Sequence, residues 1–420
     1  MKKFGRFTYT HTLYSCYVGY VTQAIINNLS PLLFVVFNRD LGISLEKISL
    51  IISVNFGVQI AVDLIGAKYV DRIGYRASGI IAHALSVIGL AFLGLLPLVV
   101  PPYAAILTAT VVLATGGGLI EVIISPIVEA LPREKKSATM SVLHSFYCWG
   151  HVAVVLLSTL YFNVAGLGLW RWLPLLWAVI PAVNIFMFCK VPFAKLVDEE
   201  KKLPVKRLLA KRAFWILFVM MICAGAAEQA VSQWSSLFAE LGLRISKTTG
   251  DLLGPCCFAF CMGLARVLFG LKADKLNLKT ALLVSSGGCF AAYMLTVFSP
   301  IPVLSLTGCA LCGFFAGILW PASFSLSSST IPEGGTPMFG LLSLGGDLGC
   351  SLGPAIVGLI SDKTADTALP SAFGSSPEEA SLKLGLLAAS SVCVVMIAFI
   401  LMLKRLSSEN PSFPDINSKI

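Results

Sequence analysis

Apolar stretches of about 20 residues recur along almost the whole chain, and they restrict what it can fold into. A helix needs a stretch of this length to cross the hydrocarbon core of a bilayer. The stretches are continuous, which excludes a transmembrane β-barrel, whose strands alternate over about ten residues. Only 13% of the 420 residues are charged, about half the share that a soluble domain carries. The sequence therefore predicts a polytopic α-helical membrane protein.

We expect twelve membrane-spanning helices, in two pseudo-symmetric bundles of six. The predicted spans lie at 10–37, 46–70, 77–99, 103–131, 137–165 and 170–192 in the first half, and at 213–240, 250–272, 279–299, 301–330, 337–361 and 381–404 in the second. The first apolar segment is too long for a signal peptide and lacks a small-residue cleavage site. We predict a first bundle at 1–192, a cytoplasmic connector at 193–212, and a second bundle with a short cytoplasmic tail at 213–420.

The basic residues are distributed unevenly between the two sides of the membrane that this topology defines. If the chain alternates sides, 23 of its 31 lysines and arginines fall on the side of the N-terminus, 7 fall on the other, and Arg266 lies within a span. The positive-inside rule then places both termini in the cytoplasm, with the chain in the cell (inner or plasma) membrane. The net charge of +9 is explained by this distribution, so no nucleic-acid partner is expected.

Two polar segments occupy equivalent places in the two halves. YVDRIGYR (69–76) follows the second span and KADKLNLK (272–279) follows the eighth, so Asp71 corresponds to Asp274. At the same offset Asp63 corresponds to Arg266. A weak internal repeat of six-helix units is typical of transporters whose solute site lies between the halves, near the middle of the bilayer.

These segments resemble the motif G-x-x-x-D-[RK]-x-G-x-[RK] of the major facilitator superfamily. The second copy has Gly270, Asp274 and Lys275, with Asn277 in place of the later glycine, and the first has Asp71, Arg72, Gly74 and Arg76, with Ala67 in place of the leading glycine. Within that superfamily the chain resembles fucose-permease-type sugar transporters. That likeness rests on NNL (27–29), GGGLIEVIISP (116–126), LHSFYCWG (143–150), AAEQAVSQWSSLF (226–238) and LWPASFSLS (319–327).

The resemblance implies a role for the two polar segments. In the superfamily, the motif residues form latches that hold the cytoplasmic ends of each half together and are exchanged during switching. The positions in this chain that match are Asp71, Arg72, Arg76, Asp274 and Lys275. The alternative is ordinary charge at the membrane edge.

Glu121 stands alone in an apolar run of the fourth span, after three glycines, Gly116 to Gly118. An ionisable group at a helix centre costs roughly 2.5 to 3.5 kcal/mol on insertion scales, so it should pair, line a cavity or carry protons. The resembling permeases use an acid at this place for proton coupling. Their aspartate shortly after NNL is Pro31 here, so the two-carboxylate arrangement is incomplete. We predict that Glu121 is the coupling carboxyl.

Two further residues are candidates for proton handling. Asp63 shares one helix face with Asn55 and Gln59, because the three are spaced four residues apart. This stripe lines a cavity or joins helices by hydrogen bonds, and the sequence does not decide between the two. His144 lies in the fifth span, where a histidine either shuttles protons or bonds to a neighbouring helix.

Amide side chains are denser in two spans than packing requires. Amides and carboxylates bind hydroxyl groups, and indole rings stack on C–H faces, so the set fits a neutral, hydroxyl-rich solute. The alternative is amide-mediated helix packing, and for Trp320 a kink at Pro321. The predicted solute-binding residues are Gln23, Asn27, Asn28, Gln59, Glu228, Gln229, Gln233, Trp234 and Trp320.

Arg266 carries a permanent charge inside the eighth span and needs a carboxylate partner. Asp347 lies at a similar estimated depth, so we predict a structural Arg266–Asp347 ion pair, with a cavity role as the alternative. Cys309 and Cys312 form a C-x-x-C on an apolar helix without histidine neighbours. They are expected to be packing residues, and neither a metal nor a cofactor is predicted.

The sequence as a whole favours a secondary transporter that works by alternating access, most simply proton-coupled uptake of a monosaccharide or a similar polar solute. The alternatives are a proton-antiporting exporter of drugs or metabolites and a non-transporting nutrient sensor, and sodium could replace the proton. No G-x-x-x-x-G-K-[ST] loop occurs, so nothing indicates ATP-driven transport. No nucleophile or metal cluster indicates an enzyme. The expected partners are the solute, the coupling ion and the lipid bilayer, and the protein is expected to be a monomer.

Overall fold

The computed structural model describes residues 7–132, 136–194, 205–272, 277–365, 373 and 376–409, and in these residues the regular structure is all helical. Eleven segments of the described chain are long and apolar enough to cross a membrane. The predicted all-α membrane fold is therefore confirmed. The residues group into two compact units, one of residues 1–198 with 247–252 and one of residues 199–246 with 253–420.

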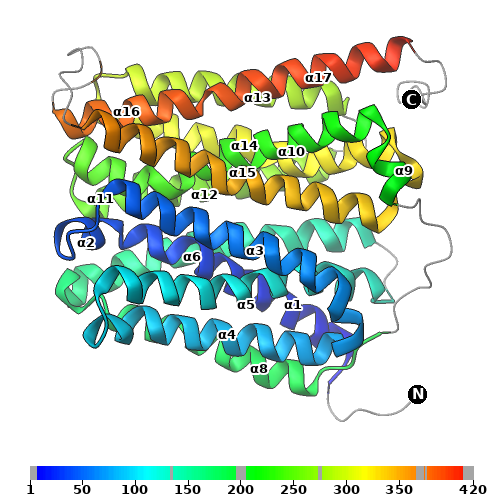
Figure 1. The fold of residues 1–420 in the computed structure, drawn as a ribbon, viewed down its shortest axis with the longest axis horizontal. Coiled ribbons are helices and arrows are strands. Elements are labelled where there is room, and N and C mark those ends of the chain that lie inside the picture. The colour runs from blue at the N-terminus through cyan, green and yellow to red at the C-terminus, as the bar shows by residue number, and fades with distance from the viewer. Residues whose placement is uncertain are drawn as a thin grey trace. The chain divides into compact units, whose positions relative to one another are not determined.

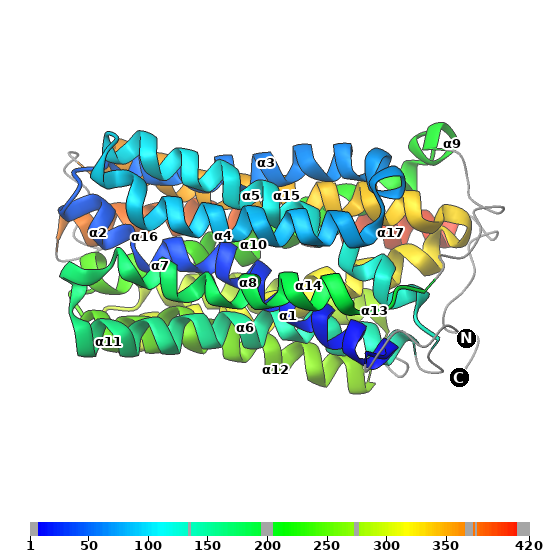
Figure 2. The same ribbon diagram turned by 90° about the horizontal axis from the view of Figure 1, so that it is seen from below.

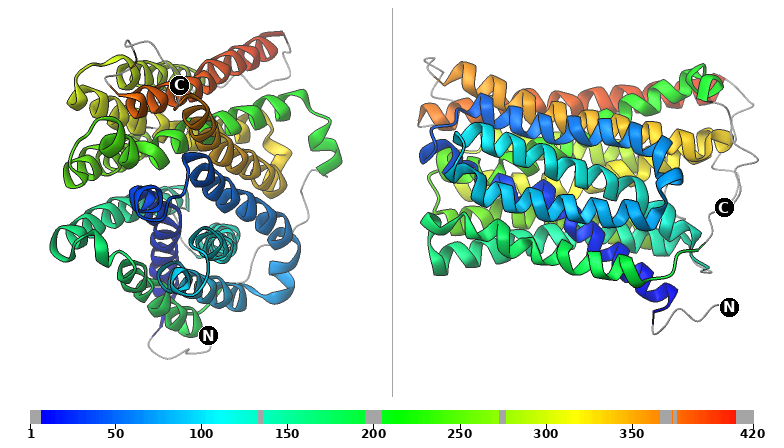
Figure 3. Two further views of the ribbon diagram at one scale, coloured as in Figure 1. Left: turned by 60° about the vertical axis from the view of Figure 1, so that its left-hand side comes forward. Right: turned by 60° about the horizontal axis from the view of Figure 1, so that its bottom comes forward.

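The helices of the first unit run side by side. In Figures 1 and 2, α3, α4 and α5 are neighbours, and α5 also packs against α1 and α6. The left view of Figure 3 looks nearly along the axis of α5. The helices are α1 (Tyr9–Leu32), α2 (Phe34–Arg39), α3 (Leu45–Ile73), α4 (Tyr75–Leu95), α5 (Pro102–Ala130), α6 (Lys136–Ala165), α7 (Trp172–Trp177), α8 (Val179–Lys190) and α11 (Lys247–Asp251).

The second unit is built in the same way. In it α10 packs against α14, α15 and α17, and α14 packs against α12 and α13. Two π-helical turns, Phe238–Gly242 and Leu252–Cys256, adjoin α10 and α12. The helices are α9 (Val205–Leu209), α10 (Arg212–Leu237), α12 (Cys257–Lys272), α13 (Leu278–Phe298), α14 (Pro302–Thr330), α15 (Gly335–Thr364), α16 (Pro377–Ala389) and α17 (Ser391–Glu409).

Helix α1 is the one predicted span that is not among the eleven apolar segments. Its 24 residues are enough to cross a bilayer, and the predicted span 10–37 also included the first four residues of the short helix α2. Polar side chains lower its hydropathy, and three of them, Gln23, Asn27 and Asn28, are at most 8% exposed. The low hydropathy of α1 therefore reflects polar groups that are buried inside the first unit.

The predicted boundaries 1–192, 193–212 and 213–420 stay a prediction, because the connector residues 195–204 lie outside the described residues. One short segment groups with the first unit although it lies late in the chain: Lys247–Leu252. There Thr248 donates a hydrogen bond to Asn163, and Thr159 donates one to Asp251. These bonds attach α11 to α6.

Backbone conformation explains the glycine of the motif at 69–76. Gly74 ends α3 and begins α4 with φ +88°, a backbone region that residues with a side chain rarely adopt. Asn277, its counterpart in the second half, has φ −70° and instead caps α13 by accepting from the backbone N–H of Thr280 at 3.1 Å. The departure from the motif is thus a different way of starting the following helix.

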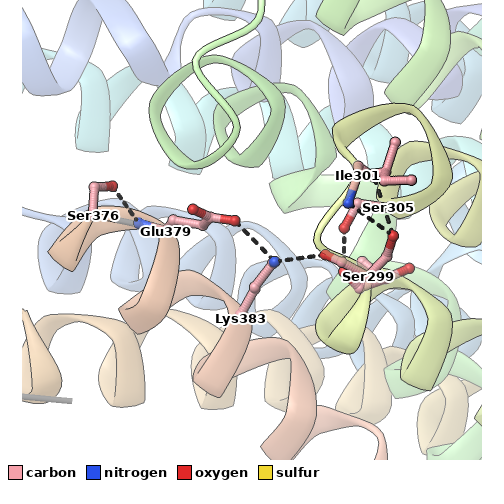
Figure 4. Close-up of polar contacts among 7 residues, drawn as sticks. Ser299, Ile301, Ser305, Ser376, Glu379 and Lys383 are labelled. Atoms are coloured by element: carbon pink, nitrogen blue, oxygen red, sulfur yellow. Dashed lines mark hydrogen bonds and ion pairs between the residues drawn. The ribbon is translucent and has the colours of Figure 1, made fainter. Parts of the chain in front are cut away.

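A buried lysine holds the start of α16 against the end of α13 (Figure 4). Lys383 is 3% exposed; its Nζ donates to the carbonyl of Ser299 at 3.0 Å and lies 2.9 Å from Oε1 of Glu379. Ser376 caps α16 by accepting from the backbone N–H of Glu379. The predicted span 381–404 includes Lys383, but the sequence pattern did not indicate these contacts.

Candidate functional site

Four amide side chains from α1 and α3 form a hydrogen-bonded chain inside the first unit. Gln23 Nε2 donates to Gln59 Oε1 at 2.7 Å. Asn27 Oδ1 accepts from both Gln59 Nε2 and Asn55 Nδ2, each at 3.1 Å. Gln23, Asn27 and Gln59 are 2%, 8% and 1% exposed, whereas Asn55 is half-buried. We call this set, Gln23, Gln59, Asn27 and Asn55, the amide chain.

The amide chain reaches the carboxyl group of Glu121. Gln23 Nε2, the atom that donates to Gln59, also donates to Glu121 Oε2 at 3.4 Å. Glu121 is half-buried on α5. An ionised carboxylate only accepts hydrogen bonds, whereas a protonated carboxyl can also donate one. The structure therefore brings together Gln23, Asn27, Gln59 and Glu121, which the sequence had placed on three separate spans.

The three glycines before Glu121 each face a different neighbouring helix, because successive helical residues point about 100° apart. A Cβ on Gly116 would lie 2.7 Å from the carbonyl oxygen of Ala82 on α4. On Gly117 it would lie 2.9 Å from Gln23 Oε1, and on Gly118 2.9 Å from Val62 Cβ on α3. The glycines thus let α4, α1 and α3 approach α5 closely, and Gly117 makes room for the amide of Gln23.

Other predicted residues of the first unit lie around this centre. Asn28 Nδ2 donates to the Ala24 carbonyl and to the Tyr147 hydroxyl. Tyr147 belongs to the segment LHSFYCWG, but it was not predicted as a site residue. The half-buried ring of His144 lies 5.2 Å from that of Tyr20. Asp63 is half-buried on α3, one turn beyond Gln59. Proton handling by Asp63 and His144 stays a prediction.

A second polar chain runs through the second unit. Gln233 Nε2 donates to Gln229 Oε1 at 2.9 Å, and Gln229 Nε2 lies 3.5 Å from Glu228 Oε1. Glu228 Oε2 accepts from Arg266 Nη2 at 3.0 Å. Arg266 Nε also donates to the carbonyl of Gly317 on α14. Glu228, which we had predicted to bind solute, is therefore the acidic member of a buried ion pair that the sequence did not reveal.

The partner that we predicted for Arg266, Asp347, is 3% exposed on α15. The Arg266–Asp347 pair stays a prediction beside the Arg266–Glu228 pair, whose distance is known. The sequence did not suggest Glu228 as the partner, because Arg266 lies near the cytoplasmic end of its predicted span and the two residues were not estimated to lie at the same depth in the membrane. A guanidinium on a long side chain reaches beyond its own turn.

The two predicted tryptophans have packing contacts within the second unit. Trp234 is fully buried, and its Nε1 donates to the carbonyl of Pro354 at 3.1 Å. The half-buried ring of Trp320 lies against Gly346, where an added Cβ would come within 2.1 Å of Cη2. In this arrangement the indole of Trp234 presents no face to a solute, which favours the packing alternative for this residue.

Of the predicted latch residues, the structure describes the side chains of Arg72 and Arg76. Asp71 lies in α3, but its side chain is outside the described part, as are Asp274 and Lys275. Arg76 donates to the carbonyls of Phe188, Cys189 and Val191 at 2.6 to 2.8 Å, and so caps the carboxyl end of α8. Arg72 is exposed, with its guanidinium 5.9 Å from the ring of Tyr69.

Solved structures show the same fold at low sequence identity. A bacterial homologue of the human lysosomal transporter Spinster matches with a TM-score of 0.75 at 15% identity, covering 94% of this chain and 97% of its own. The E. coli fucose:proton symporter FucP (TM-score 0.64, 15% identity) covers 94% and 99%. A D-xylose–proton symporter (TM-score 0.71, 12% identity) covers 93% and 98%.

Comparison with curated protein sequences finds no match. The model of one protein family, the Major Facilitator Superfamily, matches residues 16–354, which is most of the chain. This family match makes the protein a secondary transporter and not an enzyme. The chain belongs to the Major Facilitator Superfamily.

Proposed function

We propose that the protein takes up a neutral, hydroxyl-rich solute, such as a monosaccharide, together with a proton by alternating access. The observation that carries this proposal is the amide chain ending on Glu121. Amides offer both donors and acceptors, which is what a sugar hydroxyl needs, and they carry no charge that a neutral solute would have to neutralise.

The location of Glu121 supports the choice of coupling group. It is half-buried in a helix that packs against four others, and it accepts a hydrogen bond from the neutral amide of Gln23. A carboxyl in such a place is suited to binding and releasing a proton during a transport cycle. Glu228 is less suited because Arg266 lies 3.0 Å away and stabilises its charge.

The orientation follows from the charge distribution. The 23-to-7 division of basic residues supports cytoplasmic termini and a cytoplasmic connector at 193–212. Two solved neighbours are described as sugar–proton symporters, and at their identity they show the fold alone. They justify including L-fucose and D-xylose in the first solute panel.

The test is transport by purified protein in proteoliposomes, after a thermal-shift screen with L-fucose, D-xylose, D-glucose and uridine. A solute at 100 times its Kd should stabilise the native state by about 2.7 kcal/mol. Glu121→Gln mimics the protonated acid, so it should exchange labelled for unlabelled solute but fail to accumulate it when a proton gradient is applied. Glu333→Gln, an exposed carboxyl between α14 and α15, is the matched control and should accumulate normally.

Normal pH-driven accumulation by Glu121→Gln would remove the coupling role from this residue. Proton-driven efflux of an apolar drug, without stabilisation by any of the four polar solutes, would instead support the exporter alternative.

A further inference from the structure

The hydrogen bonds that connect Glu121 with Asn27 start at Gln23, whose Nε2 donates both to Glu121 and to Gln59. Gln23 donates through Nε2 to Gln59, and Gln59 donates through Nε2 to Asn27. Gln59 therefore accepts on one side and donates on the other, whereas Gln23 donates on both sides. Such a series has two self-consistent polarities, because turning one amide places two like atoms face to face and forces the next amide to turn.

The amide of Gln23 has an acceptor atom that is not used in this arrangement. Gln23 Oε1 is buried and has no hydrogen-bond partner among the described residues. It points at Gly117, where a Cβ would lie 2.9 Å away. Because Gly117 has no side chain, the amide has room to exchange its oxygen and nitrogen by a half turn about Cγ–Cδ.

Protonation of Glu121 changes what Gln23 must offer. The contact of Nε2 with Glu121 Oε2 suits an ionised carboxylate, which only accepts, whereas a carboxyl group protonated at Oε2 presents a hydroxyl there that needs an acceptor. Nε2 cannot accept, but Oε1 can once the amide has turned. Gln23 Oε1 would then face Gln59 Oε1, so Gln59 must also turn, and its Nε2 then donates to Gln23. Gln59 Oε1 would in turn face Asn27 Oδ1, so the Asn27 amide must turn as well.

We infer that Gln23 is a positioning residue that couples the protonation of Glu121 to the orientation of the Asn27 amide by reversing the polarity of the amide chain. This inference rests on the proposed function, since it makes Glu121 the proton-binding group. No proton passes through Gln23: the proton joins and leaves the carboxyl of Glu121, and the amides only rotate.

The exposure along the amide chain fits this role. Glu121 and Asn55 are half-buried at the two ends, while Gln23 and Gln59 between them are at most 2% exposed. Asn55 now donates to Asn27 Oδ1, so a reversal at Asn27 also changes what Asn55 presents. A hydroxyl-bearing solute at that end meets a different donor and acceptor pattern in the two states, which links its affinity to the proton.

Other titratable groups lie on the helices packed against α5, and a pH titration has to distinguish their signals from that of Glu121. Both ring nitrogens of His83 are engaged, Nδ1 by the Gly79 carbonyl and Nε2 by Asn184. The Tyr20 hydroxyl contacts Ser125. These groups include Tyr20 on α1, Asp63 on α3, His83 on α4, and His144, Tyr147 and His151 on α6.

The experiment needs no solute, because the proton is the probe. Infrared difference spectra of the full-length protein in lipid are recorded between about pH 5 and 8, with the asparagine side-chain carbonyls labelled with carbon-13. The carboxyl band reports protonation, and the labelled asparagine band reports the orientation of the amides. Asn27→Leu assigns the responding band to Asn27.

In the wild type the carboxyl and asparagine bands should change together with pH, and Glu121→Gln should lose both changes. Gln23→Met has the same length but no hydrogen-bonding group, so it should keep the carboxyl change and lose the asparagine change. The matched control is Thr22→Val on the same helix, because Thr22 is fully buried and its hydroxyl donates to the Val18 carbonyl of its own helix. This variant should keep both changes.

The inference is overturned if the asparagine band of Gln23→Met still follows the carboxyl band, or if wild-type asparagines do not respond while Glu121 titrates. Failure of the proposed function looks different, since the carboxyl change would then persist in Glu121→Gln. Asp63→Asn and His144→Gln, recorded in the same way, show which of the other groups has taken the proton in that case.

Discussion

The ion pair between Arg266 and Glu228 is expected to be the most costly polar contact to break in the second unit. The side chains are 14% and 7% exposed, and Nη2 and Oε2 lie 3.0 Å apart. Glu228→Gln leaves a permanent guanidinium charge without its carboxylate. Arg266→Met leaves a carboxylate beside Gln229 and the apolar interior of the unit.

Removal of one partner from a buried ion pair typically costs about 3 to 5 kcal/mol, whereas replacement of both by groups of similar volume is often nearly neutral. Glu228→Gln and Arg266→Met should therefore each lower the free energy of unfolding by about 3 kcal/mol, and the double variant by about 1 kcal/mol. The coupling energy would then be about 5 kcal/mol, far above the roughly 0.5 kcal/mol that additive sites show.

The assay is reversible unfolding in mixed detergent and dodecyl sulfate micelles, with helicity as the signal. Asp347→Asn in the same assay tests the predicted Arg266–Asp347 pair, through its own coupling with Arg266→Met. Additive effects of Glu228→Gln and Arg266→Met would refute the expected coupling, because two groups that neutralise each other cannot contribute independently.

Two further variants test contacts within single units. Arg76→Gln loses most of the cap on α8 and should destabilise the protein by about 1.5 to 3 kcal/mol in the same unfolding assay, whereas Arg72→Gln, at an exposed position, should be neutral. Equal effects of the two would mean that the cap contributes nothing. Trp234→Phe loses one hydrogen bond to Pro354 and should cost about 0.5 to 1.5 kcal/mol without changing solute affinity. A clear loss of affinity would return Trp234 to the solute site.

Much of the fold could be predicted because lipid leaves a helix few options. The predicted span 46–70 became α3 (Leu45–Ile73), and 301–330 became α14 (Pro302–Thr330). A missing hydrogen bond in lipid costs several kcal/mol, so apolar length alone defines such helices. Breaks within spans were not predicted, since the π-helical turn at Leu252–Cys256 depends on local packing that hydropathy does not report.

The site could be predicted by residue type but not by partner. The amides and Glu121 were recognisable because polar groups in apolar spans are costly. Their pairing depends on how each helix is rotated about its axis, which the sequence does not determine. Gln23 on α1 donates to Gln59 on α3, whereas the indole of Trp234 donates to the carbonyl of Pro354 within the second unit. The three glycines before Glu121 were a sequence signal for these pairings, because each lies where another helix approaches α5 closely.

The described polar chains have a consequence for alternating access. The bonds from Glu121 to Asn55 lie within the first unit, and those from Gln233 through Glu228 and Arg266 lie within the second. Motion of one unit relative to the other would therefore break none of these bonds, and the amide chain can change its polarity without involving the other unit. Under the proposed function, the barrier to switching depends on contacts that solute and proton can change. The amide chain is such a place in this proposal, because one carboxyl would set its polarity and its half-buried end, Asn55, is an amide that a hydroxyl can bind.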